Sequence, residues 1–200
     1  MRVMARFLLS ASDVAHFPPP GLPEIAFLGR SNVGKSSVIN SLVGHKLART
    51  SSTPGRTRSI NFFEIRRAGR PKPELLFADL PGYGYAKLSR EISQEWGRFI
   101  DPYLEQRPSL ALCLALIDAN VPQQESDRQL LDFLASRGRP RIIVATKSDR
   151  MSGNDRAQAM RRLSQEHPGV PVVAFSAKTG AGKEELWSQI RSHADNFTLV

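Results

Sequence analysis

The sequence predicts an α/β domain with a mostly parallel sheet and helices on both faces. From residue 110 to residue 193, short apolar runs alternate with longer stretches of helical periodicity, the order typical of parallel strands joined by helices. A glycine-rich stretch stands between an apolar run and an amphipathic segment near residues 25–43. With 200 residues, 40% of them hydrophobic, the chain can bury one such core and leaves little room for a second.

The N-terminal segment is predicted to be a leader, which brings the chain to the sheet without belonging to the core. It has room for one short strand and ends in a stiff, proline-rich run at residues 18–23. We therefore expect a leader at residues 1–23, a nucleotide-binding domain at residues 24–194 and a tail at residues 195–200.

Hydropathy and cysteine content indicate the compartment. No apolar stretch reaches the roughly 20 residues that a membrane-spanning helix needs, and the apolar run near the N-terminus is too short for a signal peptide. The single cysteine, Cys113, lies within an apolar run, where a buried, unreactive thiol is expected. We therefore expect a soluble protein in a reducing compartment, the cytoplasm.

The other elements follow from periodicity and turn residues. Residues 45–58 follow neither the helical nor the strand period and predict a mobile loop. The turn at residues 69–71 predicts that its flanking strands form a hairpin, and Trp96 and Trp187 are expected in the core. We expect strands at residues 24–28, 59–67, 74–78, 110–117, 141–145 and 171–175, and helices at residues 34–43, 89–106, 123–137, 154–166 and 182–193.

The glycine-rich stretch fits the phosphate-binding pattern G-x-x-x-x-G-K-[ST]. In this pattern successive backbone N–H groups converge on phosphate oxygens, and the following helix adds the positive end of its dipole. Lys35 is expected to reach the β and γ phosphates, and the Ser36 hydroxyl to bind Mg²⁺. A glycine-rich turn could fit by accident, but a predicted strand and helix flank this one as the motif requires. The motif comprises Gly29, Arg30, Ser31, Asn32, Val33, Gly34, Lys35 and Ser36.

A second stretch is expected to meet Mg²⁺ and the γ phosphate. Asp79-Leu80-Pro81-Gly82 fits the D-x-x-G element, in which Asp79 would hold Mg²⁺ through water and the Gly82 N–H would contact the γ phosphate. Loss of the γ phosphate would then release the loops that it holds, which is how hydrolysis becomes a conformational signal.

The aperiodic loop contains the candidate for the threonine that closes over Mg²⁺ and the γ phosphate. Thr57 is preferred because Gly55, two residues earlier, frees the loop to swing inward. Thr50 and Thr53 compete for this role, and an ordinary turn residue is the simpler interpretation. Lys35 and Thr57 are the expected catalytic residues. The neighbours expected to line the nucleotide are Gly55, Arg56, Arg58 and Ser59.

Two later loops distinguish guanine from adenine. Thr146-Lys147-Ser148-Asp149 follows an apolar strand and fits the guanine-reading pattern [N/T]-K-x-D. The Asp149 carboxylate can accept from the ring N–H and the exocyclic amino group of guanine, a pair that adenine lacks, and the Lys147 stem can cover the base. Ser176-Ala177-Lys178 fits the second guanine loop, whose backbone N–H groups would meet the base oxygen. The residues expected to bind the nucleotide here are Phe175, Ser176 and Ala177.

The positive charge lies almost entirely in the first third of the chain. Of the net charge of +9, residues 1–70 carry +8 and residues 71–200 carry +1. An excess confined to one region predicts an electrostatic footprint for a phosphate-rich polymer, and an ordinary solvated surface is the alternative. A nucleic-acid or ribonucleoprotein partner is therefore expected.

The motifs together resemble one family. Gly-Arg-Ser-Asn-x-Gly-Lys-Ser, Thr-Pro-Gly-Arg-Thr and Asp-Leu-Pro-Gly-Tyr-Gly-Tyr-Ala, in this order, look like the EngB (YihA/YsxC) family of bacterial GTPases over about residues 5–194. The resemblance implies a Ras-like G domain with a six-stranded sheet, and Mg²⁺-dependent hydrolysis of GTP to GDP. It also implies a role in assembly of the large ribosomal subunit, whose precursor would be the partner, and a link to formation of the division septum.

Two other functions stay open at this point. The chain could be a nucleotide-dependent interaction module at the division septum with negligible turnover. It could also be a GTPase of another RNA pathway, such as tRNA modification, although 200 residues leave no room for an appended domain of that kind.

One expected catalytic group is missing. Ras-type enzymes orient the attacking water with a glutamine just after the D-x-x-G glycine, and here Tyr83 takes that place. We therefore expect slow turnover unless a partner or a cation helps. Asn32 stands where potassium-activated relatives, which the chain resembles, hold K⁺ with an asparagine carbonyl, and such an ion would offset developing charge. Alternatively, Asn32 only satisfies hydrogen bonds within its loop.

Overall fold

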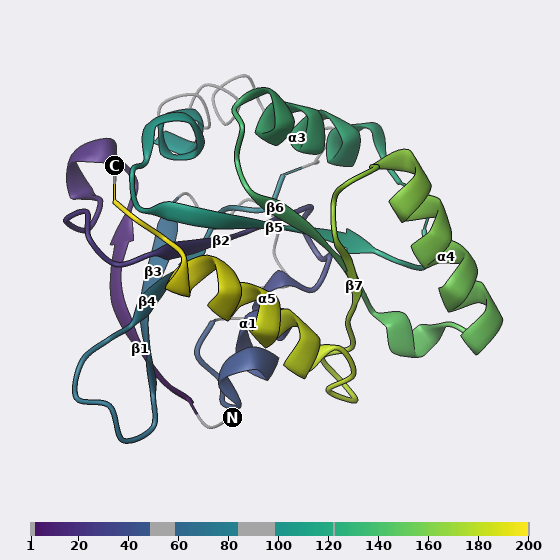
Figure 1. The fold of residues 1–200 in the computed structure, drawn as a ribbon, viewed down its shortest axis with the longest axis horizontal. Coiled ribbons are helices and arrows are strands. Elements are labelled where there is room, and N and C mark those ends of the chain that lie inside the picture. The colour runs from purple at the N-terminus through teal and green to yellow at the C-terminus, as the bar shows by residue number, and fades with distance from the viewer. Residues whose placement is uncertain (1–2, 49–58, 84–98, 122, 200) are drawn as a thin grey trace.

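The computed structural model describes residues 3–48, 59–83, 99–121 and 123–199. These residues form a seven-stranded sheet in the order β1-β3-β4-β2-β5-β6-β7 (Figure 1). The strands from β4 to β7 in this order are parallel, and β3 and β1 continue the sheet with antiparallel pairings. The mostly parallel α/β architecture is thereby confirmed. The strands are β1 Val3–Ala11, β2 Glu24–Gly29, β3 Ile60–Arg67, β4 Leu75–Asp79, β5 Leu110–Asp118, β6 Arg141–Thr146 and β7 Val172–Ala174.

Helices cover both faces of the sheet. The buried side chains of α1 and α5 pack in one core cluster, and those of residues 99–106, α3 and α4 pack in another on the opposite face, as Figure 1 shows for α1, α5 and α3. In the described part of the chain, no helix is long and apolar enough to cross a bilayer. The helices are α1 Lys35–Val43, α3 Glu125–Ser136, α4 Gly153–Glu166 and α5 Lys183–Asp195, with short 3₁₀ turns at Val14–His16 and Ser148–Arg150.

The N-terminal segment differs from the prediction, and the expected count of six strands is wrong. Strand β1 lies within residues 1–23 and pairs with β3 along its whole length, and its end residues Val3 and Ala11 are buried in the core. The register shifts between Phe7 and Leu9, so residues before and after this bulge pack on opposite faces. Because the bulge breaks the alternation with period two, the strand left no clear pattern in the sequence.

Most other predicted elements are confirmed. The hairpin of β3 and β4 is present, and Trp187 is almost fully buried. Cys113 is buried, which raises the pKa of its thiol to about 12. Of the helix expected at residues 89–106, residues 99–106 are helical. The rest of that range, including Trp96, lies outside the described residues.

A buried ion pair closes the amino-terminal end of β2. The Glu24 carboxylate is fully buried and accepts from the Arg107 guanidinium at 2.5 and 3.0 Å and from the Tyr103 hydroxyl at 2.9 Å. Arg107 also donates to the Pro18 carbonyl at 2.6 Å and lies over the Phe17 ring at 5.7 Å. The pair therefore ties the N-terminal segment to the helix at residues 99–106.

Replacing Glu24 by Gln should destabilise the protein. The substitution leaves the Arg107 charge buried and uncompensated, which costs about 3 kcal/mol in the free energy of unfolding, measured by urea denaturation. The control is Glu64→Gln, whose partner Arg6 is exposed, so its stability should stay near that of the unchanged chain. Equal stabilities of the two variants would contradict a structural role for the buried pair.

Candidate nucleotide-binding site

Loops that carry the predicted site residues meet at one edge of the sheet. The phosphate motif follows β2, the D-x-x-G element follows β4, and the two guanine-reading stretches follow β6 and β7. Because these strands are parallel members of one sheet, their carboxyl ends lie along the same edge, where α/β proteins bind ligands.

The phosphate motif bends the chain from β2 into α1. Gly34 precedes the helix with φ 105°, in the left-handed region that glycine tolerates best. It offers no side-chain cap to the helix. No capping side chain therefore competes for the first N–H groups of α1, which are the groups that bind anions.

An ion pair joins the phosphate motif to the D-x-x-G element. The Lys35 ammonium, at the start of α1, contacts the Asp79 carboxylate, at the end of β4. The two side chains are 12% and 8% exposed, so the pair is largely shielded from water. The structure thus brings together the lysine and the aspartate that the sequence assigned to the phosphates and to Mg²⁺.

The donor atoms near this pair suit a magnesium ion. The Ser36 hydroxyl and the Asp79 carboxylate are hard oxygen ligands of the kind that Mg²⁺ prefers. No group of three or more His, Cys, Asp or Glu side chains that could hold a metal occurs among the described residues. The chemistry of Ser36 and Asp79 thus fits their predicted roles toward Mg²⁺, with Asp79 acting through water.

The first guanine loop is fastened directly to the phosphate motif. The buried Thr146 hydroxyl donates to the Val33 carbonyl at 2.7 Å, and the Lys147 ammonium donates to the Asn32 carbonyl at 2.9 Å. Asn32 and Lys147 have φ values of 63° and 58°, the only positive values at non-glycine residues in the described ranges. Backbone strain of this kind concentrates at functional sites, and here the two strained residues touch each other.

The two guanine loops also contact each other. The Ser176 hydroxyl donates to the Asp149 carboxylate at 2.6 Å, and this hydrogen bond is the main reason that the pKa of Asp149 is lowered. Asp149 is exposed and Ser176 is fully buried. The Ser176 N–H donates a hydrogen bond to the Ala181 carbonyl at 3.0 Å. The following peptide, at Ala177, is therefore the better candidate to meet a base oxygen.

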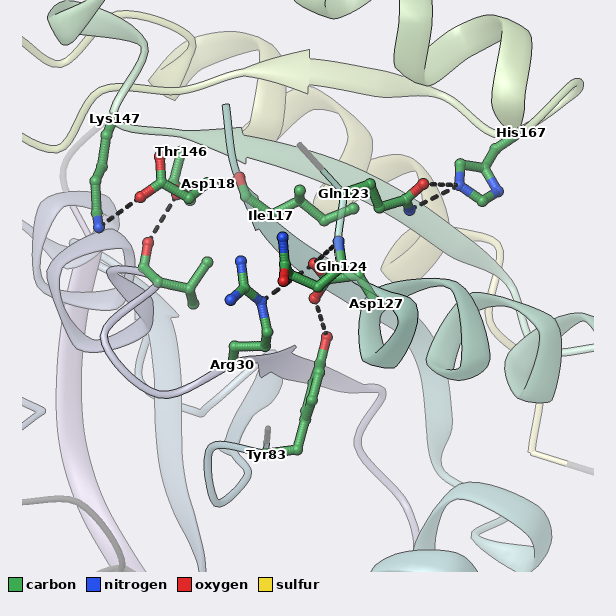
Figure 2. Close-up of polar contacts among 11 residues, drawn as sticks. Arg30, Tyr83, Ile117, Asp118, Gln123, Gln124, Asp127, Thr146, Lys147 and His167 are labelled. Atoms are coloured by element: carbon green, nitrogen blue, oxygen red, sulfur yellow. Dashed lines mark hydrogen bonds and ion pairs between the residues drawn. The ribbon is translucent and has the colours of Figure 1, made fainter. Parts of the chain in front are cut away.

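Two residues that sequence reasoning missed hold Lys147 in place. The Asp118 carboxylate, at the end of β5, lies 2.7 Å from the Lys147 ammonium (Figure 2). The Asn120 amide donates to the Lys147 carbonyl at 3.1 Å. Burial alone would raise the pKa of Asp118, but the hydrogen bonds from Lys147 and Asn120 lower it. The sequence signal that could have identified Asp118 is its position: it is a charged residue at the end of β5, the strand that pairs with β6.

A second missed group links three segments. Figure 2 shows Arg30 and Tyr83 both pointing toward Asp127 near the start of α3. Arg30 Nε lies 3.2 Å and the Tyr83 hydroxyl 3.0 Å from its carboxylate oxygens. Burial, together with the Asp127 charge, raises the pKa of Tyr83. The tyrosine at the usual glutamine position is thus held by α3.

Some predicted residues cannot be placed by the structure. Thr57 and its competitors Thr50 and Thr53 lie outside the described residues, as do Gly55, Arg56 and Arg58. Ser59 is described and directly precedes β3. The roles assigned to this loop stay predictions.

Comparison with known proteins gives consistent matches. A family model described as 50S ribosome-binding GTPase matches residues 24–147. The chain is 57% identical over 190 residues to the probable GTP-binding protein EngB of Koribacter versatilis, covering 95% of this chain and 94% of that protein. It is also 57% identical over 199 residues to the EngB protein of Acidobacterium capsulatum, covering 99% and 94%.

Solved structures share the fold. A crystal structure of a probable GTP-binding protein EngB has a TM-score of 0.68 at 22% identity, covering 87% of this chain and 99% of that one. Era in complex with MgGDPNP and nucleotides 1506–1542 of 16S ribosomal RNA has a TM-score of 0.74 at 24% identity, covering 91% and 60%.

Asp149→Asn should change the base preference. A carboxamide cannot accept both guanine N–H groups but can complement the extra carbonyl of xanthine. We expect GTP affinity to fall at least about tenfold, because hydrogen bonds to charged groups are lost, and xanthosine triphosphate affinity to rise. Fluorescence titration measures both, with the exposed Asp132→Asn on α3 as control. Unchanged GTP affinity would show that Asp149 does not read the base.

Asp118→Asn should loosen Lys147 where it is expected to cover the base. Loss of the ion pair frees the lysine stem, so affinities for GDP and a non-hydrolysable GTP analogue should both fall about fivefold. The ratio of the two affinities should not change, because Lys147 covers the base and not the γ phosphate. An effect on the triphosphate alone would contradict this assignment.

Proposed function

The chain belongs to the EngB family of GTP-binding proteins and carries a GTPase domain, and from this premise we propose that its GTPase cycle switches its attachment to the precursor of the large ribosomal subunit in the cytoplasm. The observation that carries the proposal is a basic hairpin between β3 and β4. Strand β4 leads from this hairpin to the D-x-x-G element. The description of the matching family model, a ribosome-binding GTPase, agrees with this partner.

In the proposed complex, the nucleotide lies across the loops described above. Lys35 exchanges the Asp79 carboxylate for β and γ phosphate oxygens, and Asp149 accepts from guanine while the Ala177 N–H meets the base oxygen. When bound, Mg²⁺ would supply positive charge that offsets the charge developing on the transferred phosphoryl group. Ser36 and Asp79 would hold that ion.

Slow intrinsic hydrolysis follows from the position of Tyr83. Its hydroxyl is engaged with Asp127, and a phenol cannot orient water as a glutamine amide does. Among the described residues, Lys35 is then the main electrostatic contributor to the transition state. A group from the ribosomal precursor or a monovalent cation would raise the rate.

The basic hairpin is formed by the end of β3 and the start of β4. Arg67, Arg70 and Lys72 are exposed at or beside its turn, and the Arg67 guanidinium pairs with Glu74 while Arg66 donates to the Arg70 carbonyl. Strand β4 runs from this hairpin to Asp79 at the nucleotide edge. Cationic side chains of this kind bind RNA phosphates by releasing counterions.

Reversing the hairpin charge should weaken ribosomal attachment. In sedimentation with large-subunit precursors and a GTP analogue, Arg70→Glu with Lys72→Glu should lower the bound fraction several-fold, and the loss should diminish as salt rises. The matched control is Arg161→Glu with Arg162→Glu on α4, where both residues are exposed. Equal loss in both pairs would indicate only a net-charge effect and would contradict docking through the hairpin.

Nucleotide dependence separates the proposal from the septum module. Binding of the unchanged chain should be stronger with the GTP analogue than with GDP, and GTP turnover should rise when precursor is added. Sedimentation that is indifferent to the nucleotide, together with turnover that precursors do not change, would overturn the switch.

Potassium stimulation rests on Asn32. Its backbone carbonyl accepts from Lys147, so its side-chain oxygen is the less encumbered group for a cation. GTP hydrolysis should be faster in K⁺ than in Na⁺ at equal ionic strength, and Asn32→Gly, which tolerates the same φ, should abolish the difference. Equal rates in the two salts would remove potassium from the mechanism.

A further inference from the structure

Asp127 carries a buried carboxylate on a helix outside the nucleotide loops. This carboxylate is 1% exposed and lies in the first turn of α3. It accepts from the Gln124 backbone N–H at 3.3 Å within a capping box, from Arg30 Nε at 3.2 Å and from the Tyr83 hydroxyl at 3.0 Å (Figure 2). One buried carboxylate therefore joins the phosphate motif, the residue after the D-x-x-G glycine and a helix outside the nucleotide loops.

The backbone around Tyr83 is bound to the phosphate motif as well. The Tyr83 N–H donates to the Gly29 carbonyl at 3.3 Å, and the Ser31 N–H donates to the Tyr83 carbonyl at 3.1 Å. Tyr83 and Arg30 thereby form an isolated parallel bridge. The D-x-x-G element is thus held on the phosphate motif through its main chain, while its tyrosine side chain reaches α3.

Gly82 allows this close approach. A Cβ atom at this position would lie 2.9 Å from Ser31 Oγ, closer than real Cβ atoms come, and 3.1 Å from Ser31 Cα, closer than most of them come. The peptide assigned to the γ phosphate is therefore packed against the phosphate motif. In the same arrangement Lys35, the other group assigned to the terminal phosphate, is paired with Asp79.

We infer that Asp127 is a positioning residue that, through Tyr83, holds Gly82 packed against Ser31 of the phosphate motif. The inference rests on the proposed role of Gly82 in binding the γ phosphate. GTP must draw Gly82 toward its terminal phosphate and strain or break the Tyr83–Asp127 hydrogen bond, whereas GDP makes no such demand. We call the Tyr83–Asp127 hydrogen bond the latch; it is closed when made and open when broken. A ligand shifts the balance of closed and open forms only by its differential affinity for them. The latch therefore lowers GTP affinity relative to GDP affinity.

The test compares affinities for GDP and for a non-hydrolysable GTP analogue in the whole chain with Mg²⁺. Tyr83→Phe keeps the ring and removes one hydrogen bond, so affinity for the analogue should rise about three- to tenfold while GDP affinity stays constant. Asp127→Asn should change the ratio in the same direction. Fluorescence titration and calorimetry give the two constants independently.

Two controls separate the latch from general loosening. Tyr103→Phe removes another buried tyrosine–carboxylate hydrogen bond, the one to Glu24, and should lower stability while leaving the ratio of affinities unchanged. Asp132→Asn is exposed on the same helix as Asp127 and should change neither. A shift in ratio confined to Tyr83→Phe and Asp127→Asn supports the inference.

Two kinds of result would contradict the proposals, and each contradicts a different one. An unchanged ratio in Tyr83→Phe, or a fall in analogue affinity relative to GDP, would overturn the latch, and this variant decides the matter even if Asp127→Asn does not fold. Failure of the unchanged chain to bind either nucleotide would instead contradict the nucleotide site itself. The two failures are therefore distinguishable.

Discussion

The tie between the guanine loop and the phosphate motif is the constraint on which the rest of the site depends. Thr146 and Lys147 donate to successive carbonyls of the phosphate motif, at Val33 and Asn32, and Asp118 fixes the lysine from the other side. These bonds set the separation between the place for a base and the place for phosphates. Because a nucleotide has fixed dimensions, this separation matters as much as the chemistry of either loop.

The sequence predicted the parallel part of the fold because those strands are buried on both faces. Strands such as β5 and β6 read as continuous apolar runs, and the polar residues directly after β6 marked the site edge. Strand β1 is different, because it lies at an edge, is half exposed and contains a bulge. Its residues pair with β3 residues that lie 49 to 64 positions further along the chain, which no local pattern records.

The site was predicted where a motif fixes the spacing and missed where contacts join distant segments. Lys35, Asp79, Asp149 and Ser176 stand in short patterns whose chemistry is local. Asp127 acquires its role only because α3 brings it within reach of segments from other parts of the chain. Glu24 and Arg107 pair in the same long-range way across 83 positions. Side chains that meet only after folding leave no spacing to detect.

The bulge in β1 has a consequence for the behaviour of the molecule in concentrated solution. An edge strand offers unpaired backbone groups to any other chain, and an uninterrupted one invites sheet-to-sheet association. The bulge between Phe7 and Leu9 interrupts the regular spacing of the backbone N–H and C=O groups along the outer edge of β1. The charged, exposed Arg6 lies beside the bulge. The bulge that removes the alternating pattern of β1 from the sequence thus also disfavours pairing of β1 with a strand of another molecule, and with it fibrous aggregation.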